Sequence, residues 1–180
     1  MLLKKIASHL IAGAEKRVGV KFDYIHEIAQ SDLSLLARYN KIFGFLDPNK
    51  KAPPLAYHAA RLRGAIAADC GTCVEAEINL ARQAGIDVAV INSILGANQS
   101  GLSEPILAVV RLSDAVVGSR EDDPDARDVI RRAYGAAGLI EICYAMNGAA
   151  LLPGVKRAMG HATRCDLSVL QLKNNNSKGT

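Results

Sequence analysis

The sequence predicts an all-α fold, a compact bundle of several helices, and three observations support this. Aromatic residues make up only 4% of the 180 residues, tryptophan is absent and alanine is abundant. Small apolar side chains suit closely packed helices, whereas sheets favour β-branched and aromatic residues. Apolar residues also recur at helical spacing between short breaks. Finally, no alternating run is long enough for a strand, although "VGVKF" and "VAVI" resemble short ones.

The expected helices are justified in order from the N-terminus. The first covers 2–16, with an apolar face of Leu2, Leu3, Ile6, Leu10 and Ile11. The second covers about 32–46 and begins at a cap formed by Ser31 or Asp32. Its inner face would comprise Leu35, Leu36, Tyr39, Ile42, Phe43 and Leu46. "DPNKKAPP" is then a loop, and its double proline suits the first turn of a helix over about 54–68.

The second half of the chain continues the same pattern. Asp69 is the expected N-cap of a helix from Cys70 to about Ala84, which ends at Gly85 in the C′ position. Asp87 caps the next helix, which ends near Gly96. The remaining helices are expected over about 104–118, from Pro124 to Gly135, and over about 137–151 and 153–170.

The chain length suits one domain with a buried core. With 49% hydrophobic and 22% charged residues, the composition is that of a globular protein. We assign residues 1–171 to a single helical domain. The polar end, 172–180, lacks apolar periodicity and is expected to be disordered. The net charge of +4 is mild and no basic stripe with interleaved aromatics is present, so we expect no nucleic-acid partner.

The N-terminal segment "MLLKKIASHLIAGAEK" is interpreted as an amphipathic helix and not as a signal peptide, because its apolar stretch is short and contains His9. No run of about 18 apolar residues is present, so no membrane span is expected. These features favour a cytoplasmic protein, in which thiols stay reduced unless a cysteine pair cycles between two redox states.

The strongest chemical signal is the segment "DCGTCVEAE", in which Cys70 and Cys73 stand at the start of an expected helix. Free backbone N–H groups and the helix dipole favour thiolate there, and the spacing allows the sulfurs to meet. Thioredoxin also contains such a pair but needs a preceding sheet, which this sequence does not predict. A redox dithiol is therefore the preferred interpretation, with two ordinary buried thiols as the alternative.

Two further residues could assist these thiols. Glu77 lies one helical turn after Cys73 on the same face, and a partly desolvated carboxylate there can accept the thiol proton. His58 lies on the preceding helix beside an apolar stripe, where a histidine is more often a core residue than a catalyst. Arg61 or Arg63 could contact an anionic substrate if its side chain points into the site, but the solvated face of that helix is the preferred interpretation for both.

The other two cysteines suggest less chemistry. Cys143 is in the most apolar segment and is expected to act as a small hydrophobe. Cys165 lies four residues after His161, a spacing that a metal site could use. A metal-binding or interaction protein with Cys70, Cys73, Cys165 and His161 as ligands is thus a further alternative. No cofactor is otherwise indicated.

Residues 57–87, "YHAARLRGAIAADCGTCVEAEINLARQAGID", resemble the signature of the carboxymuconolactone decarboxylase and alkylhydroperoxidase D (AhpD)-like superfamily. Its members share an "LR" helix, a Cys-x-x-Cys at the next helix start and an "AR-x-x-G" exit. The later segments "LSEPILAVVRLSDAVV" and "GLIEICYAMNGAALLPGVKRAMG" resemble the family more loosely. The resemblance implies an all-helical AhpD-like bundle that assembles as a homo-oligomer.

The resemblance also implies a function. In the redox branch, a Glu twelve residues before the first cysteine and a His four residues after the second form a proton relay. Here those positions hold His58 and Glu77, so the two residue types are exchanged. Carried over, Cys73 would attack a peroxide, Cys70 would resolve the intermediate, and an external lipoyl- or thioredoxin-type dithiol would reduce the pair. Lactone decarboxylation, the chemistry of the other branch, does not rely on a Cys-x-x-Cys.

Overall fold

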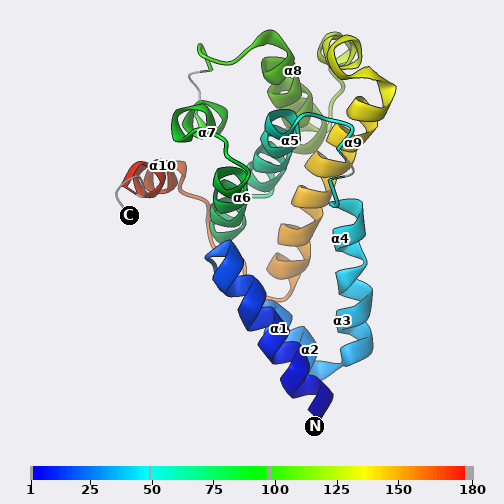
Figure 1. Ribbon diagram of the computed structural model, residues 1–180, viewed down its shortest axis with the longest axis vertical. Helices are drawn as coiled ribbons and strands as arrows, with labels where there is room; N and C mark the ends of the chain where they lie inside the picture. The colour runs from blue at the N-terminus through cyan, green and yellow to red at the C-terminus, as the bar shows by residue number, and fades with distance from the viewer. Residues whose placement is uncertain (1, 49, 97–98, 177–180) are drawn as a thin grey trace.

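The computed structural model describes residues 2–48, 50–96 and 99–176, and in this part of the chain it contains helices and connecting segments but no strand (Figure 1). The prediction of an all-α fold is confirmed. The helices are α1 (Leu2–Val18), α2 (Asp23–Ser31), α3 (Leu33–Asn40), α4 (Ile42–Phe45), α5 (Pro54–Ala67), α6 (Gly71–Gln83), α7 (Val88–Leu95), α8 (Glu104–Ser113), α9 (Pro124–Ala158) and α10 (Leu167–Asn176). A π-helical turn, η1 (Asp114–Ser119), extends α8.

The main core forms around α5 and α9, which pack side by side with α6 and α8 against them (Figure 1). The backbones of α5 and α9 approach so closely that a Cβ atom on Gly64 would overlap the carbonyl oxygen of Met146. Leu62, Val109, Ile130 and Met146 are completely buried in this core. Burial of such side chains stabilises the bundle by about 1.5–3 kcal/mol each.

Helices α1–α4 form a second group, which extends from one end of the main core (Figure 1). Its own smaller core consists of Ile11, Tyr24, Ile25, Ala29 and Tyr39. The hydroxyls of Tyr24 and Tyr39 share a hydrogen bond of 2.6 Å, which satisfies both groups inside this core. The C-terminal end of α9 reaches this group through Leu152 and Val155. Helix α9 thus contributes side chains to both cores.

Several local signals predicted the elements correctly. The carboxylates of Asp32 and Asp87 accept the N–H groups of Ser34 and Ala89, both at 2.6 Å, and cap α3 and α7. Gly85 lies at the C′ position of α6 with a φ of 83°, the left-handed conformation that glycine adopts without strain. A backbone break at Gly135 divides α9 where the sequence predicts a helix boundary.

Other boundaries were wrong. The expected helix over 32–46 is divided at Lys41 into α3 and α4, and α2 was not predicted. Of the six residues assigned to its inner face, Tyr39 and Leu46 are buried, whereas Leu35 and Phe43 are more than one-third exposed. The first helix also differs from expectation, because Leu2, Leu3, Ile6 and Leu10 are 49–72% exposed and Ile11 alone of the five is buried.

The C-terminal third also required correction. Helix α9 continues through Pro153 to Ala158, so the expected boundary before Pro153 is absent. Residues 159–166 form a non-helical segment, which we call the covering loop, and α10 follows it. Helix α10 extends to Asn176, past the boundary predicted at 171, and the Asn174 amide donates to Asn92 Oδ1 at 2.9 Å. Residues 177–180 of the expected disordered end lie outside the described residues.

One helix of the described part, α9, is long and apolar enough to cross a membrane by length and composition alone. No such segment was expected from the sequence, because no run of about 18 apolar residues is present. The helix forms the centre of the main core, and 44% of its most apolar window is buried there. Core helices of globular proteins meet the same criterion, so this is weak evidence for a membrane span.

Candidate functional site

The cysteine pair lies at the start of α6. Cys70 is the N-cap residue of this helix, and Cys73 follows three residues later, with 5.2 Å between the two Cα atoms. Their sulfur atoms are joined in a disulfide. Cys70 is completely buried, whereas Cys73 is half-buried. The two thiols therefore differ in accessibility, and Cys73 is the one that a small molecule can reach.

The covering loop occupies the backbone donors at the start of α6. Two of these donors bond to Thr163. The Gly71 N–H donates to the Thr163 carbonyl oxygen at 3.1 Å, and the Thr72 N–H donates to the Thr163 hydroxyl at 3.3 Å. The N–H of Cys73 donates to the Cys70 carbonyl oxygen at 3.0 Å. The free N–H groups that were expected to favour thiolate here are therefore already bonded.

Asp69 does not cap this helix, in contrast to the prediction. Its backbone has a left-handed φ of 47°, and Cys70 takes the N-cap position without a side-chain hydrogen bond. The Asp69 carboxylate instead accepts the N–H of Cys165 at 3.0 Å. Asp69 therefore fixes the covering loop against the turn that precedes Cys70.

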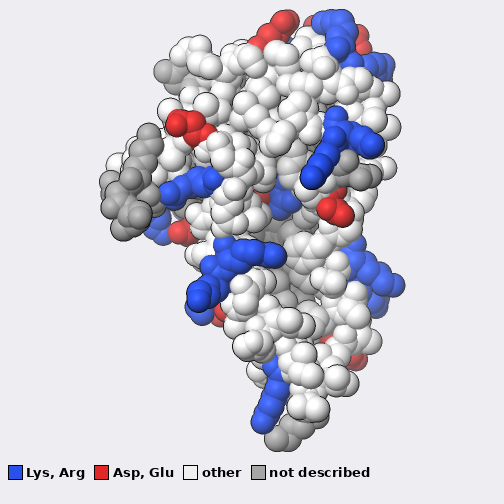
Figure 2. Space-filling view, in the orientation of Figure 1, with Lys and Arg blue, Asp and Glu red and all other residues white. Residues whose placement is uncertain are grey.

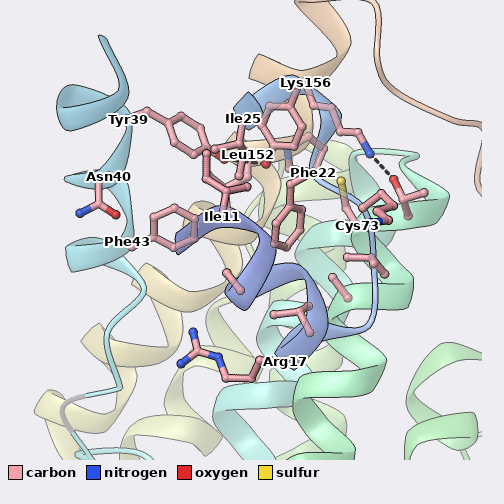
Figure 3. Close-up of a pocket in the computed structure, with 18 of the residues that line it drawn as sticks. Ile11, Arg17, Phe22, Ile25, Tyr39, Asn40, Phe43, Cys73, Leu152 and Lys156 are labelled. Atoms are coloured by element: carbon pink, nitrogen blue, oxygen red, sulfur yellow. Dashed lines mark hydrogen bonds between the residues drawn. The ribbon is translucent and has the colours of Figure 1, made fainter. Parts of the chain in front are cut away.

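A cavity of about 650 Å³ opens beside Cys73, between α6 and the N-terminal helices (Figure 3). Figure 2 shows a hollow in the surface between the two parts of the molecule, with Lys and Arg side chains around it. Most of the cavity wall is apolar, with contributions from Ile11, Phe22, Ile25, Leu36, Phe43 and Leu152. The charged residues that line it are Arg17, Lys21, Arg61, Glu77 and Lys156. Cys70 and His58 are not among the residues that line it.

Glu77 lines the cavity and forms a buried ion pair with Arg61 of α5. The Arg61 Nε and Nη2 groups donate to the two carboxylate oxygens at 2.7 and 2.8 Å, a bidentate arrangement. Burial opposes the charge of Arg61, but the Glu77 carboxylate outweighs this effect and raises the pKa of the guanidinium above its usual value.

The two arginines are thus not on a solvated face, and this prediction was wrong. Arg61 is only 9% exposed, and its Nη1 group also donates to the Tyr57 hydroxyl at 2.7 Å. Arg63 donates to both oxygens of Asp114 at 2.6 and 2.8 Å, which connects α5 to η1.

His58 lies close to this ion pair but outside the cavity. Its ring packs edge-on against Tyr57, and its Nδ1 atom is buried without a hydrogen-bond partner. Burial and, to a smaller extent, the positive charge of Arg61 lower the pKa of His58 to about 4, and the Glu77 carboxylate opposes both effects. His58 is therefore neutral at neutral pH, and the structure brings Glu77, but not His58, to the cavity that Cys73 lines.

Lys156 is a site residue that sequence reasoning missed. It is 6% exposed and lines the cavity, and its amine donates to the Thr72 hydroxyl (Figure 3). The ammonium also lies 5.7 Å from the centre of the Tyr24 ring. Because a helix boundary was expected at Pro153, no signal in the sequence placed Lys156 on the same helix as the buried core.

The remaining cysteines, Cys143 and Cys165, do not line the cavity. Burial raises the pKa of Cys143, and it raises that of Cys165 with a further contribution from Asp69. His161 Nε2 lies 2.6 Å from a carboxylate oxygen of Glu27. Among the described residues, no group of three or more His, Cys, Asp or Glu side chains could hold a metal ion. The metal site considered for Cys70, Cys73, Cys165 and His161 thus receives no support.

The chain was also compared with known proteins. No protein-family model, curated protein or solved structure matches it.

Proposed function

We propose that this protein is a thiol-dependent peroxidase, in which Cys73 reacts with a hydroperoxide and Cys70 resolves the product as a disulfide. One observation carries the proposal: the paired cysteines differ in exposure, and only Cys73 lines the apolar cavity, whereas Cys70 is completely buried behind it. The resemblance of residues 57–87 to the AhpD-like superfamily supports the same assignment, including a bundle of the AhpD type.

The proposed reaction has three steps. The Cys73 thiolate attacks the terminal peroxide oxygen, so that an S–O bond forms, the O–O bond breaks and an alcohol leaves with one added proton. The Cys70 thiol then displaces water from the Cys73 sulfenic acid and forms the disulfide. An external dithiol, of the lipoyl or thioredoxin type, then reduces the Cys70–Cys73 disulfide to two thiols and is itself oxidised to a disulfide. No cofactor is needed, and a cytoplasmic setting would keep such a dithiol reduced.

Glu77 is proposed as the acceptor of the Cys73 proton, because it follows Cys73 by one turn and lines the same cavity. Its bidentate pairing with Arg61 fixes the carboxylate and leaves further lone pairs on its oxygens. His58 is neutral at neutral pH and does not line the cavity, so no proton transfer with the thiol is assigned to it.

Mass spectrometry of the thiols after addition of one equivalent of tert-butyl hydroperoxide tests the proposal. We expect the reduced wild type to form a Cys70–Cys73 disulfide. In Cys70→Ser, a sulfenic acid should be trapped on Cys73 with dimedone, because no resolving thiol remains. In Cys73→Ser, Cys70 should stay unmodified because it is buried. A Cys143→Ser/Cys165→Ser variant serves as the matched control and should react like wild type.

Four unmodified thiols in the wild type would contradict the proposal. A metal-binding protein, or a protein that kept the fold and lost the chemistry, would then be the leading candidate. A metal analysis of protein purified without chelator would test the metal-binding alternative. Oxidation of Cys70 first, with Cys73 as the resolving thiol, would retain a thiol peroxidase but reverse the two assignments.

A further inference from the structure

Lys156 is a buried cation that forms no salt bridge with a carboxylate among the described residues, although the charge of Asp23 acts on it. Its amine lies inside the cavity wall, and its direct interactions are the hydrogen bond to the Thr72 hydroxyl and the contact with the Tyr24 ring. A buried ammonium costs several kcal/mol unless it is paired. Lys21, in contrast, forms a salt bridge with the Glu15 carboxylate. An anionic or polar molecule that enters the cavity could therefore bind the Lys156 ammonium and compensate its charge.

Thr72 connects this ammonium to the cysteine pair. The Thr72 hydroxyl oxygen lies 3.7 Å from Cys70 Sγ and accepts the hydrogen bond of Lys156. Thr72 and Cys73 are consecutive residues of α6, and both line the cavity. In Figure 3, the amine of Lys156 and the sulfur of Cys73 point toward the same region of the cavity. An oxygen atom in contact with Cys73 would thus be close to a hydroxyl and to an ammonium group.

We propose that Lys156 and Thr72 form a binding site for the peroxide oxygens beside Cys73, and that Lys156 gives a proton to the alkoxide that leaves. This inference rests on the proposed function and deepens it. The substrate class is a hydroperoxide with an apolar organic group, which the apolar wall of the cavity would hold. Neither peroxide binding nor proton transfer by these side chains needs a free backbone N–H group. The Gly71 and Thr72 N–H groups already donate to the covering loop.

The chemical step balances as follows. The thiolate electron pair forms the S–O bond, the O–O bond breaks, and negative charge develops on the alkoxide oxygen. The Lys156 ammonium stabilises this charge and transfers a proton to it, which gives the alcohol. The proton that Cys73 lost on ionisation returns the amine to its charged form. Sulfur is oxidised to the sulfenic acid and the peroxide is reduced to alcohol.

The electrostatic surroundings of Lys156 predict its pH behaviour. Burial lowers the pKa of Lys156, and the carboxylate of Asp23 on α2 opposes this shift. Burial raises the pKa of Tyr24, also on α2, so this hydroxyl stays protonated in the pH range in which Lys156 titrates. Cys73 and the Arg61–Glu77 pair line the same cavity. The rate of Cys73 oxidation should therefore fall at alkaline pH, below the ordinary titration range of a lysine, as the ammonium loses its proton.

Stopped-flow oxidation of reduced wild type and Lys156→Met by tert-butyl hydroperoxide tests the site, with hydrogen peroxide as a second probe. We expect Lys156→Met to react roughly 10²-fold more slowly, the usual loss when one donor to a developing oxyanion is removed. It should also lose the alkaline limb of the pH–rate profile. Lys156→Arg should keep most of the rate, because it retains the cation. Thr72→Val should react more slowly than Thr72→Ser, which keeps the hydroxyl.

Two controls make the outcome decisive. Exposed Lys16 does not line the cavity, and Lys16→Met should match wild type. Circular dichroism and thermal melting show whether each variant is folded, and Lys156→Met removes a buried charge without loss of volume. A wild type that reacts while Lys156→Met reacts equally fast overturns this inference and leaves the peroxidase proposal intact. A wild type that does not react overturns both.

Discussion

At the scale of single residues, the Arg61–Glu77 ion pair couples stability to the candidate site. Both side chains are buried and their interaction is bidentate. Removal of one partner therefore leaves an uncompensated charge in the protein interior. We expect Glu77→Leu to lower the free energy of unfolding by about 3–5 kcal/mol. Urea denaturation measures this change.

Two variants show whether the ion pair itself is responsible. The double variant Arg61→Met/Glu77→Leu should recover much of the lost stability, because it removes both charges. Asp122→Asn, in an exposed ion pair with Arg127, should change stability little. A double variant as unstable as Glu77→Leu would show that lost packing, and not an unpaired charge, destabilises the protein.

His58 makes stability depend on pH. Its pKa is about 4 in the folded protein and about 6.5 in an unfolded chain. Above pH 6.5 both states are neutral, but between pH 6.5 and 4 the unfolded chain binds a proton that the folded protein does not. The free energy of unfolding should therefore fall across this window as the pH is lowered. Partial exposure limits the effect to roughly 1–3 kcal/mol.

The comparison of His58→Gln with wild type by urea denaturation at pH 7.5 and 4.5 measures this effect. The variant should lose less stability between the two pH values than wild type. His9→Gln, a change at an exposed histidine of α1, is the matched control and should behave as wild type. Equal acid sensitivity of wild type and His58→Gln would mean that His58 titrates normally in the folded protein.

The sequence predicted correctly how residues of one helix lie relative to each other, but not which residues of different helices come into contact. The spacing of Cys73 and Glu77 placed both on one face of α6, and both line the cavity. Arg61 was assigned to solvent because the face that α5 turns toward α6 depends on tertiary packing. Lys156 was missed for the same reason, since its neighbours Thr72 and Tyr24 are more than 80 residues away in the sequence.

At the scale of elements, the contact between α5 and α9 depends on Gly64. A Cβ at this position would overlap the Met146 carbonyl oxygen and approach Ala149 Cβ to 3.3 Å, and backbone cannot move aside cheaply. We expect Gly64→Ala to destabilise the protein by about 1–3 kcal/mol, the usual cost of overpacking a core. Thermal and urea unfolding measure it.

Gly13 is the matched control for this prediction. It lies inside α1 with open space around its Cβ direction, so Gly13→Ala should stabilise the protein by about 0.5–1 kcal/mol through helix propensity. If the two alanine variants shifted stability equally, helix propensity and not the α5–α9 contact would dominate at Gly64.

The elements show which sequence signals are dependable. Helix starts with a carboxylate cap, such as those at Asp32 and Asp87, and the C′ glycine at position 85 depend on local chemistry and were predicted correctly. Helix α2 lacks a side-chain cap at Phe22, and its preceding segment resembled a strand, so local chemistry did not reveal it. Pro153 indicated a boundary, but it is completely buried and tertiary packing maintains α9 through it.

At the scale of the whole molecule, α1 presents an apolar surface that the described residues of this chain leave exposed. Leu2, Leu3, Ile6 and Leu10 are 49–72% exposed, although their spacing is that of a buried face. Association of copies of this chain, which the resemblance to the AhpD-like superfamily implies, would cover it. We therefore expect the purified protein to exceed the 19.1 kDa mass of one chain in light scattering.

Charge substitutions locate this contact. Leu3→Lys/Ile6→Lys should shift the protein toward the mass of one chain, because a buried interface does not accept two unpaired ammonium groups. Leu172→Lys, at an exposed leucine of α10, is the control and should keep the wild-type mass. A wild type with the mass of a single chain would contradict association, and an unchanged mass of the double variant would place the contact elsewhere.

The covering loop has a consequence for how the disulfide is reduced. It rests on the start of α6 so closely that a Cβ on Gly71 would lie 2.7 Å from the Arg164 carbonyl oxygen. With Cys70 enclosed beneath, the approach to the disulfide runs through the cavity to the Cys73 sulfur. A slender dithiol on a flexible arm can enter by that route, whereas a dithiol on a broad folded surface would first have to displace the loop. With the proposed peroxidase function, we therefore expect a reductant of the lipoyl type to reduce the disulfide faster than one of the thioredoxin type.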